Sequence, residues 1–194
     1  MATAANSSID VSSRALILIG AEPITSFEDS TNEALVASNM YEDIARAALT
    51  NCRWRFATEQ AQLNLLSDAP TGRYDAAYQL PSNLIMLHAV TVNDFPIEYQ
   101  TYGDKVFCDA GSTETLIADY TFRALEVDWP SYFTIAVEYT LASMFAVSIA
   151  RDTAMAGMME EKAVLSMAKA RSSDAQQQTT RKFNTSRYIT QRRS

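Results

Sequence analysis

The stretch RWRFATEQAQLNLL, Arg53–Leu66, is where the sequence changes from a helical pattern to a strand pattern. Before it, small and apolar residues recur at helical spacing and predict one long helix from Ser30 to about Trp54. After it, short segments rich in β-branched and aromatic residues alternate with turn residues, such as Gly103-Asp104, which predicts a tight hairpin. The segment from 116 to 123 alternates in polarity, which predicts a strand with one buried and one largely solvated face.

The segment ILIGAEPITSFEDSTNEA, which precedes the long helix, is predicted to be a turn between two helices. Gly20 can adopt the positive φ that ends a helix, and Pro23 follows within three positions. Ser30 and Glu33 have the spacing of a capping box, which predicts the start of the next helix. A phosphate-binding loop needs several glycines and a lysine, and because this segment has one glycine and no lysine, it is interpreted as a turn.

Two more helices are predicted after the β segment. Trp129 and Pro130 introduce a helix that is apolar nearly all round, which is typical of a helix at the centre of a fold or between subunits. Asp152 is expected to cap a fourth helix. Methionines and an alanine form one stripe on that helix, which is interpreted as core, with an adaptable contact surface as the alternative: Met155, Met159, Ala163 and Met167.

The order of these segments predicts an α+β fold. Helices that must pack together flank the β segment, so the expected architecture is a four-helix bundle with a β-sheet subdomain inserted between helices 2 and 3, plus an extended C-terminal tail. The predicted boundaries are 1–56 and 124–171 for the helical bundle, 57–123 for the inserted β subdomain and 172–194 for the extended basic tail. Tyr132–Ala150 is long and apolar but carries Glu138, so a buried helix is expected rather than a membrane span, and no signal peptide is expected in MATAANSSID.

Few residues in the sequence could perform chemistry. Cys52 and Cys108 are far apart and His88 is the only histidine, so neither a zinc site nor a disulfide is indicated, and two reduced thiols are expected. His88 lies in a strand pattern and is interpreted as a structural residue. The sequence therefore predicts no catalytic, cofactor-binding or metal-binding residues and no enzymatic activity.

Four segments carry a resemblance to a known family. They are ALILIGAEPITSFEDSTNEA, CRWRFA, AAYQLPSNLIMLHAV and DWPSYFTIAVEYTLA, which begin at Ala15, Cys52, Ala76 and Asp128. In this order and spacing they resemble the head-to-tail adaptor family of tailed bacteriophages, whose best-known branch is the tail tubular protein A of short-tailed phages. The resemblance spans about Ser13–Ala170.

The resemblance implies a structural virion protein of the neck or tail, assembled in the host cytoplasm. Members form a ring, usually a dodecamer, that joins the portal protein to the tail nozzle protein and lines the DNA channel; tail fibres are a further candidate partner. Genomic DNA would pass through without sequence-specific binding, and neither a membrane nor a cofactor is implied. Residues interpreted as a structural motif are Gly20, Pro23, Trp54, Phe56, Tyr78, Leu80, Pro81, Trp129 and Pro130.

The charge is distributed unevenly along the chain. Five of the sixteen basic residues follow Thr180, so residues 1–180 have eleven bases against twenty-three acids, a charge of −12 that suits a channel wall along which DNA slides. The tail is expected to be disordered when free and to fold on an acidic neighbour, with the portal as the leading candidate. Its predicted portal-contacting residues are Arg181, Lys182, Phe183, Arg187, Tyr188, Ile189, Arg192 and Arg193.

Two alternative functions stay open at this point. One is a tail-associated peptidoglycan hydrolase, for which Glu138 is the candidate acid because it is the only carboxylate in a strongly apolar pattern. The other is a nucleic-acid-binding module that acts through the basic tail, where Phe183 and Tyr188 are interleaved with arginines.

Overall fold

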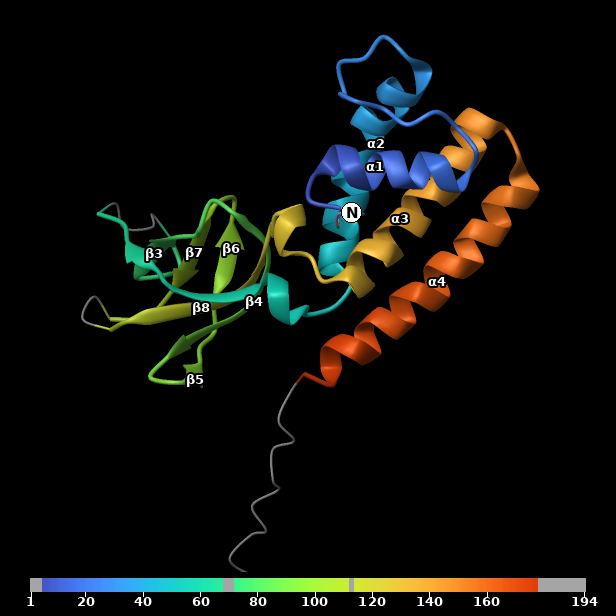
Figure 1. Ribbon diagram of the computed structural model, residues 1–194. Coiled ribbons are helices and arrows are strands. Elements are labelled where there is room, and N and C mark those ends of the chain that lie inside the picture. The colour runs from blue at the N-terminus through green and yellow to red at the C-terminus, as the bar shows by residue number, and fades with distance from the viewer. Residues whose placement is uncertain (1–4, 68–71, 112–113, 178–194) are drawn as a thin grey trace, which may run out of the picture.

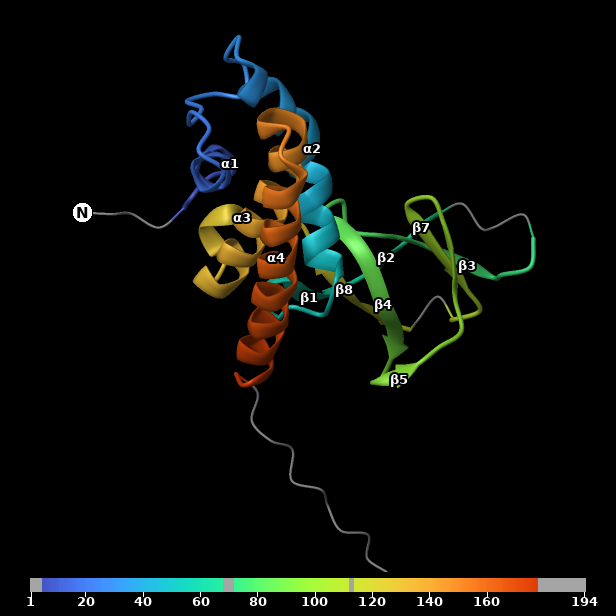
Figure 2. The ribbon, with the colours of Figure 1, turned by 90° about the vertical axis from the view of Figure 1, so that its right-hand side faces the viewer.

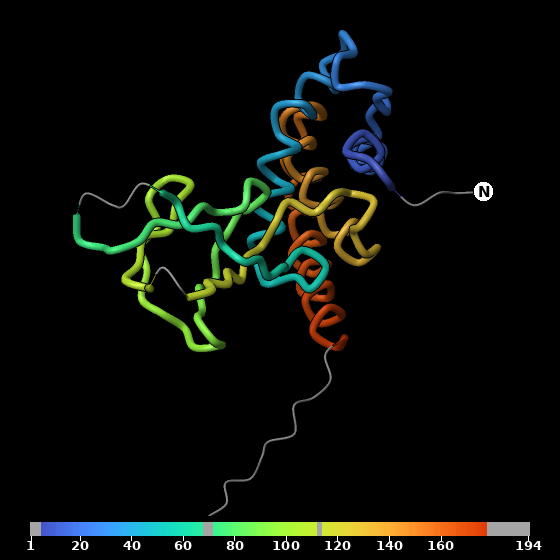
Figure 3. Tube along the Cα trace, turned by 90° about the vertical axis from the view of Figure 1, so that its left-hand side faces the viewer, coloured from blue at the N-terminus to red at the C-terminus, as the bar shows by residue number. Residues whose placement is uncertain are grey.

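The computed structural model describes residues 5–67, 72–111 and 114–177. Within these residues the chain forms four α-helices and two antiparallel sheets, which confirms the predicted α+β class (Figure 1). The strands lie between α2 and α3 along the chain and gather on one side of the helices (Figure 3). The helices are α1 (Ser8–Leu18), α2 (Asn32–Thr50), α3 (Ser131–Phe145) and α4 (Thr153–Ala175).

The turn between α1 and α2 agrees with the sequence in one respect and differs in another. Gly20 has a φ of 76°, as expected of the residue that ends α1. The predicted capping box is wrong, because Thr31 rather than Ser30 caps α2: its backbone is extended and its hydroxyl accepts a hydrogen bond from the Ala34 N–H at 3.2 Å. The helix therefore starts at Asn32, and it ends at Thr50, four residues before the expected end.

The third helix is central. It packs against α1, α2 and α4, as expected for a helix that is apolar nearly all round (Figure 2). Ser131–Ala150 has the length and hydropathy of a membrane-crossing helix, but half of it is buried inside the protein, which fits the expected core helix. Its last turn, Ala146–Ala150, is a π-helix that ends at Arg151, whose φ is 53°.

The fourth helix begins where predicted and continues further than predicted. The Asp152 carboxylate accepts hydrogen bonds from the N–H groups of Ala154 and Met155, which is the expected cap. Its methionine stripe packs into the core, since Met159 and Met167 are buried. The helix runs to Ala175 although an extended tail was expected from residue 172, because Asp174 is buried near its end and holds it in place.

The strands form two sheets around a second, smaller core. Their strand orders are β1-β8-β4-β5 and β2-β3-β7-β6. The predicted hairpin turn at Gly103, whose φ is 61°, joins β6 to β7. The strands are β1 (Thr58–Gln62), β2 (Asn64–Leu65), β3 (Ala76–Gln79), β4 (Leu84–Val92), β5 (Phe95–Pro96), β6 (Gln100–Tyr102), β7 (Lys105–Cys108) and β8 (Leu116–Phe122).

Strand β8 follows the predicted alternation of buried and solvated residues only in part. Leu116, Ala118 and Tyr120 are buried on one face, as predicted. The opposite face was expected to be largely solvated, yet Thr121 is fully buried. The His88 side chain on β4 lies beside it, with its ring nitrogen 2.7 Å from the Thr121 hydroxyl.

An aromatic cluster forms the core where the helices meet the β segment. The ring of Phe133 lies 5.0 Å from Trp54, 4.9 Å from Phe56 and 4.9 Å from Trp129, measured between ring centroids. The Trp54 and Trp129 indole N–H groups donate to the carbonyls of Ala48 and Ala124. These two residues are thereby tied to α2 and to the segment after β8.

Candidate functional site

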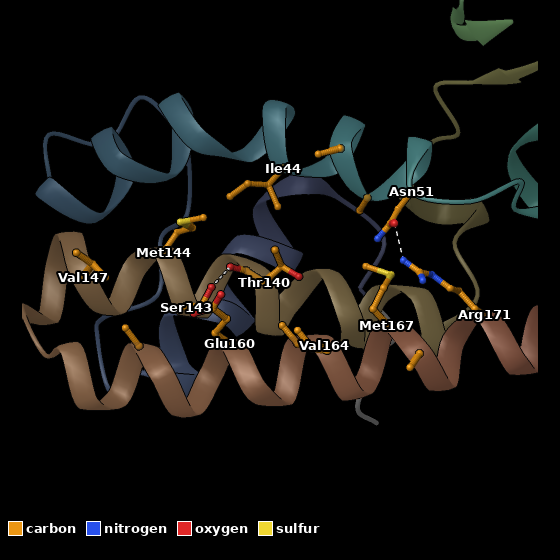
Figure 4. A pocket seen from close by; sticks show the side chains of 15 residues that line it. Ile44, Asn51, Thr140, Ser143, Met144, Val147, Glu160, Val164, Met167 and Arg171 are labelled. Carbon is orange, nitrogen blue, oxygen red and sulfur yellow. Dashed lines mark hydrogen bonds between the residues drawn. The ribbon is translucent and has the colours of Figure 1, made fainter.

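An apolar groove of about 580 Å³ lies between α2 and α4, with α3 as its floor (Figure 4). Its walls are rich in alanine, so the two helices present little side-chain bulk to the space between them. The Asn51 side-chain oxygen accepts a hydrogen bond from the Arg171 guanidinium at one end of the groove. The lining residues are Ile44, Ala47, Ala48, Asn51, Thr140, Ser143, Met144, Val147, Ala156, Glu160, Ala163, Val164, Met167, Ala168 and Arg171.

The polar groups of the groove floor are bonded within the chain. The Thr140 and Ser143 hydroxyls donate to the carbonyls of Ala136 and Thr140. The apolar side chains of Met144, Val147 and Val164 are exposed. Exposed apolar side chains that gather around one groove make it a candidate interaction surface.

An ionic cluster joins α2 to the segment between β8 and α3. The Arg123 guanidinium lies 3.0 Å from the Glu42 carboxylate and 2.6 Å from the Glu126 carboxylate. The Tyr41 hydroxyl donates to Glu126 at 2.9 Å. Burial followed by the charge of Glu126 raises the pKa of Tyr41, so this side chain stays a neutral donor.

A second polar anchor fixes the C-terminal end of α4. The buried Asp174 carboxylate accepts hydrogen bonds from the Arg55 N–H at 3.3 Å and from the Tyr132 hydroxyl at 3.0 Å. Burial and the hydrogen bond to Asp174 raise the pKa of Tyr132 to about 12. The two anchors together set the position of α4 and of the β segment relative to α2 and α3.

The residues considered for chemistry have structural environments. The His88 ring hydrogen-bonds the Thr121 hydroxyl and burial lowers the pKa of His88, an environment compatible with the predicted structural histidine. Cys52 and Cys108 are free thiols whose pKa values are raised, chiefly by burial. Within residues 5–67, 72–111 and 114–177, no group of three or more His, Cys, Asp or Glu side chains is placed to hold a metal ion.

Glu138, the candidate acid of the hydrolase alternative, is buried on α3. The charged group that it contacts is the Arg14 guanidinium, 3.6 Å away. A glycoside hydrolase would instead place a second carboxylate across a cleft from its acid. Burial raises its pKa and the positive charge of Arg14 partly offsets this effect. The environment is that of an ion pair between α1 and α3 in which Glu138 is buried and the Arg14 side chain is 42% exposed.

Glu138→Gln is expected to flatten the dependence of stability on pH. At pH values between the ordinary glutamate pKa of 4.5 and the raised pKa of Glu138, the carboxyl group holds its proton in the folded chain and loses it in the unfolded chain. The free energy of unfolding therefore falls as pH rises through this window, and the glutamine variant lacks this loss. Urea unfolding from pH 4 to 8 measures it, with Glu161→Gln on the exposed side of α4 as the control. Identical profiles for the parent and Glu138→Gln would contradict the assignment.

The site residues predicted from the sequence fall into two groups, the portal-contacting candidates and the structural-motif candidates. The portal-contacting candidates, Arg181 to Arg193, lie outside the described residues. The structural-motif candidates are spread over the fold: Gly20 and Pro23 lie in the α1–α2 turn, and Leu80 is buried in the smaller core. Trp54, Phe56 and Trp129 meet in the aromatic cluster, Pro130 precedes α3, Tyr78 is on β3 and Pro81 follows that strand.

The groove itself was missed by the sequence analysis. A signal for it was present, because α4 carries Met158, Val164 and Leu165 in addition to the methionine stripe. One helix face cannot hold all of these residues, so some of them must be exposed in a single chain.

Comparison with known families identifies the chain. The family described as tail tubular protein matches residues 11–123, which is more than half of the 194 residues and includes α2 and the strands. A comparison with curated proteins gives no match. The matched region contains the Arg53–Leu66 transition, the aromatic residue Phe56 of η1 (Arg55–Ala57) and both sheets. The chain therefore belongs to the tail tubular protein family, whose members are structural proteins of bacteriophage tails.

Proposed function

We propose that this protein is a head-to-tail adaptor that forms a ring of twelve copies between the portal and the tail nozzle. The observation that carries the proposal is the family match over residues 11–123, which includes the helix-to-strand transition and the inserted strands. In this assignment α1 to α4 form a helical bundle that builds the ring, and residues 57–123 form the β subdomain that projects from it. The ring encloses the channel through which DNA leaves the capsid.

The charge of the chain supports a role as a channel wall. Residues 1–180 carry twenty-three acids and eleven bases. Affinity for the DNA backbone comes from basic side chains that release counterions, so an acidic wall binds DNA weakly and lets it move. The proposed protein is a conduit without catalytic activity of its own, and Glu138, the candidate acid of the hydrolase alternative, lies beside the Arg14 guanidinium.

The experiment that tests this function is electron microscopy of the intact particle, with the protein located by an added tag. A ring of this chain directly below the portal is expected. A location elsewhere in the tail overturns the adaptor assignment, and peptidoglycan cleavage that Glu138→Gln abolishes overturns the absence of activity.

Truncation after Gln178 is expected to weaken attachment to portal rings while leaving thermal stability nearly unchanged. It removes all five bases of the tail, and it leaves α4 and the buried Asp174 intact. The loss of binding is larger at low salt, where ionic contacts are least screened. Sedimentation of the full and truncated chains with portal rings at several salt concentrations measures it. Equal binding at every salt concentration would show that the tail is not the anchor.

A further inference from the structure

We infer that the α2–α4 groove is the contact between neighbouring copies, and that it receives the outer face of α4 of the next copy in the ring. This inference rests on the proposed ring and names the surface that closes it. The groove and the outer face of α4 are two different surfaces of one chain. A contact between unlike surfaces repeats from copy to copy, as a ring requires.

The first argument is the distribution of apolar residues on α4. Met159 and Met167 are buried against α3, whereas Val164 lines the groove and is exposed. Met158 and Leu165 are also exposed and are seven positions apart, which places both on the same face away from the buried stripe. A surface helix normally has one apolar face, so a helix with apolar residues on three sides indicates that a partner covers part of it.

The second argument is the shape of the groove. Its walls carry alanines, including Ala47 on α2 and Ala168 on α4, and α3 forms its floor. Small side chains let another helix approach closely, and a methionine and a leucine on that helix can fill the space that they leave. The outer face of α4 supplies this pair, Met158 and Leu165, at the spacing of two helical turns.

The third argument is charge. Lys162 and Lys169 stand three residues before and four residues after Leu165, and Glu161 stands four residues before it, so all three share its face of α4 and are exposed. Glu160 and Arg171 line the groove. Both surfaces therefore carry charges of both signs, and the lysines of one copy can pair with Glu160 of the next while Glu161 pairs with Arg171. The ring favours the unlike contact over a symmetric one, because only an unlike contact repeats from copy to copy.

Cysteine cross-linking in assembled phage particles tests the contact. The starting protein carries Cys52→Ser and keeps the buried Cys108, and Ala47→Cys and Leu165→Cys are then added together. A short bismaleimide is expected to give a ladder of dimers, trimers and higher products, because every copy uses both surfaces. Each single variant is expected to stay monomeric, as is a control in which Thr101→Cys on the exposed strand β6 replaces Ala47→Cys.

The outcomes separate this inference from the adaptor function. Particles that contain the chain below the portal but give no ladder overturn the contact and leave the adaptor function standing. Dimers from Leu165→Cys alone overturn the unlike contact in favour of a symmetric one. Particles assembled with the parent protein that lack the chain overturn both proposals.

A second measurement uses matched leucines. Leu165 is 60% exposed and Leu125, before η2 (Glu126–Asp128), is 61% exposed. Leu165→Ser is expected to reduce incorporation into particles about tenfold or more, since burial of one leucine at a contact is worth at least that factor. Leu125→Ser is expected to leave incorporation unchanged, and both variants should melt like the parent. Equal incorporation of the two variants would overturn the contact.

Discussion

Replacing Phe133 with alanine is expected to lower the free energy of unfolding by about 3–5 kcal/mol, the range for removing a buried aromatic side chain. Phe133 is fully buried at the start of α3 and contacts the rings of Trp54, Phe56 and Trp129. Its removal leaves a cavity that three large rings cannot fill without leaving their positions. Both tryptophans are held by hydrogen bonds to backbone carbonyls, which limits this relaxation.

Urea unfolding followed by tryptophan fluorescence measures this effect, because both tryptophans of the chain belong to the cluster. Phe95→Ala is the matched control: Phe95 is 75% exposed on β5, so its loss is expected to change stability by less than about 0.5 kcal/mol. Phe133→Leu should fall between the two. A loss below about 1 kcal/mol for Phe133→Ala would show that the cluster does not hold the helices to the β segment.

Arg123→Ala is expected to lower the free energy of unfolding by about 2–4 kcal/mol, because it leaves a largely buried carboxylate without its cation. The side chains of Arg123 and Glu126 are only 17% and 11% exposed. Glu126 would keep the Tyr41 hydroxyl as a donor but lose the guanidinium at 2.6 Å. The link between α2 and the end of β8 would be lost with it.

The same cluster supplies the control for this prediction. Arg46 pairs with Glu42 at 2.6 Å, as Arg123 does at 3.0 Å, but the Arg46 side chain is 50% exposed. Arg46→Ala is therefore expected to cost about 0.5 kcal/mol or less. Urea unfolding of both variants gives the comparison, and hydrogen exchange at the α2 and β8 amides locates the loss. Equal effects of the two substitutions would contradict a special role for the buried pair.

Local features of the fold were predictable from sequence. Gly20 ends α1, Asp152 caps α4 and Gly103 forms the hairpin turn as expected, since each depends on residues within a few positions. The cap of α2 was assigned one residue early, to Ser30 instead of Thr31. Both residues can cap a helix, and the choice between them depends on how the preceding loop folds.

Long-range features were not predictable in the same way. The end of α4 depends on Asp174, whose partners Arg55 and Tyr132 lie far away in the sequence. Thr121 is buried beside the His88 side chain of the neighbouring strand β4, although its place in the alternating pattern indicated a solvated face. In both cases the environment of a side chain is set by elements that are distant in the sequence, and a local sequence pattern does not predict which elements these are.

The sequence by itself determined the α+β class, the order of the helices and strands and the family resemblance. The reason is that the spacing of apolar residues and the positions of turn residues are properties of short segments of the chain. Only the tertiary structure decided that α2 and α4 lie apart over α3 and leave the groove open. The spacing placed Met159 on the core stripe of α4, but it did not show that Leu165, on another face, is exposed. Exposure depends on which distant helices cover a face, and that is a property of the packed chain.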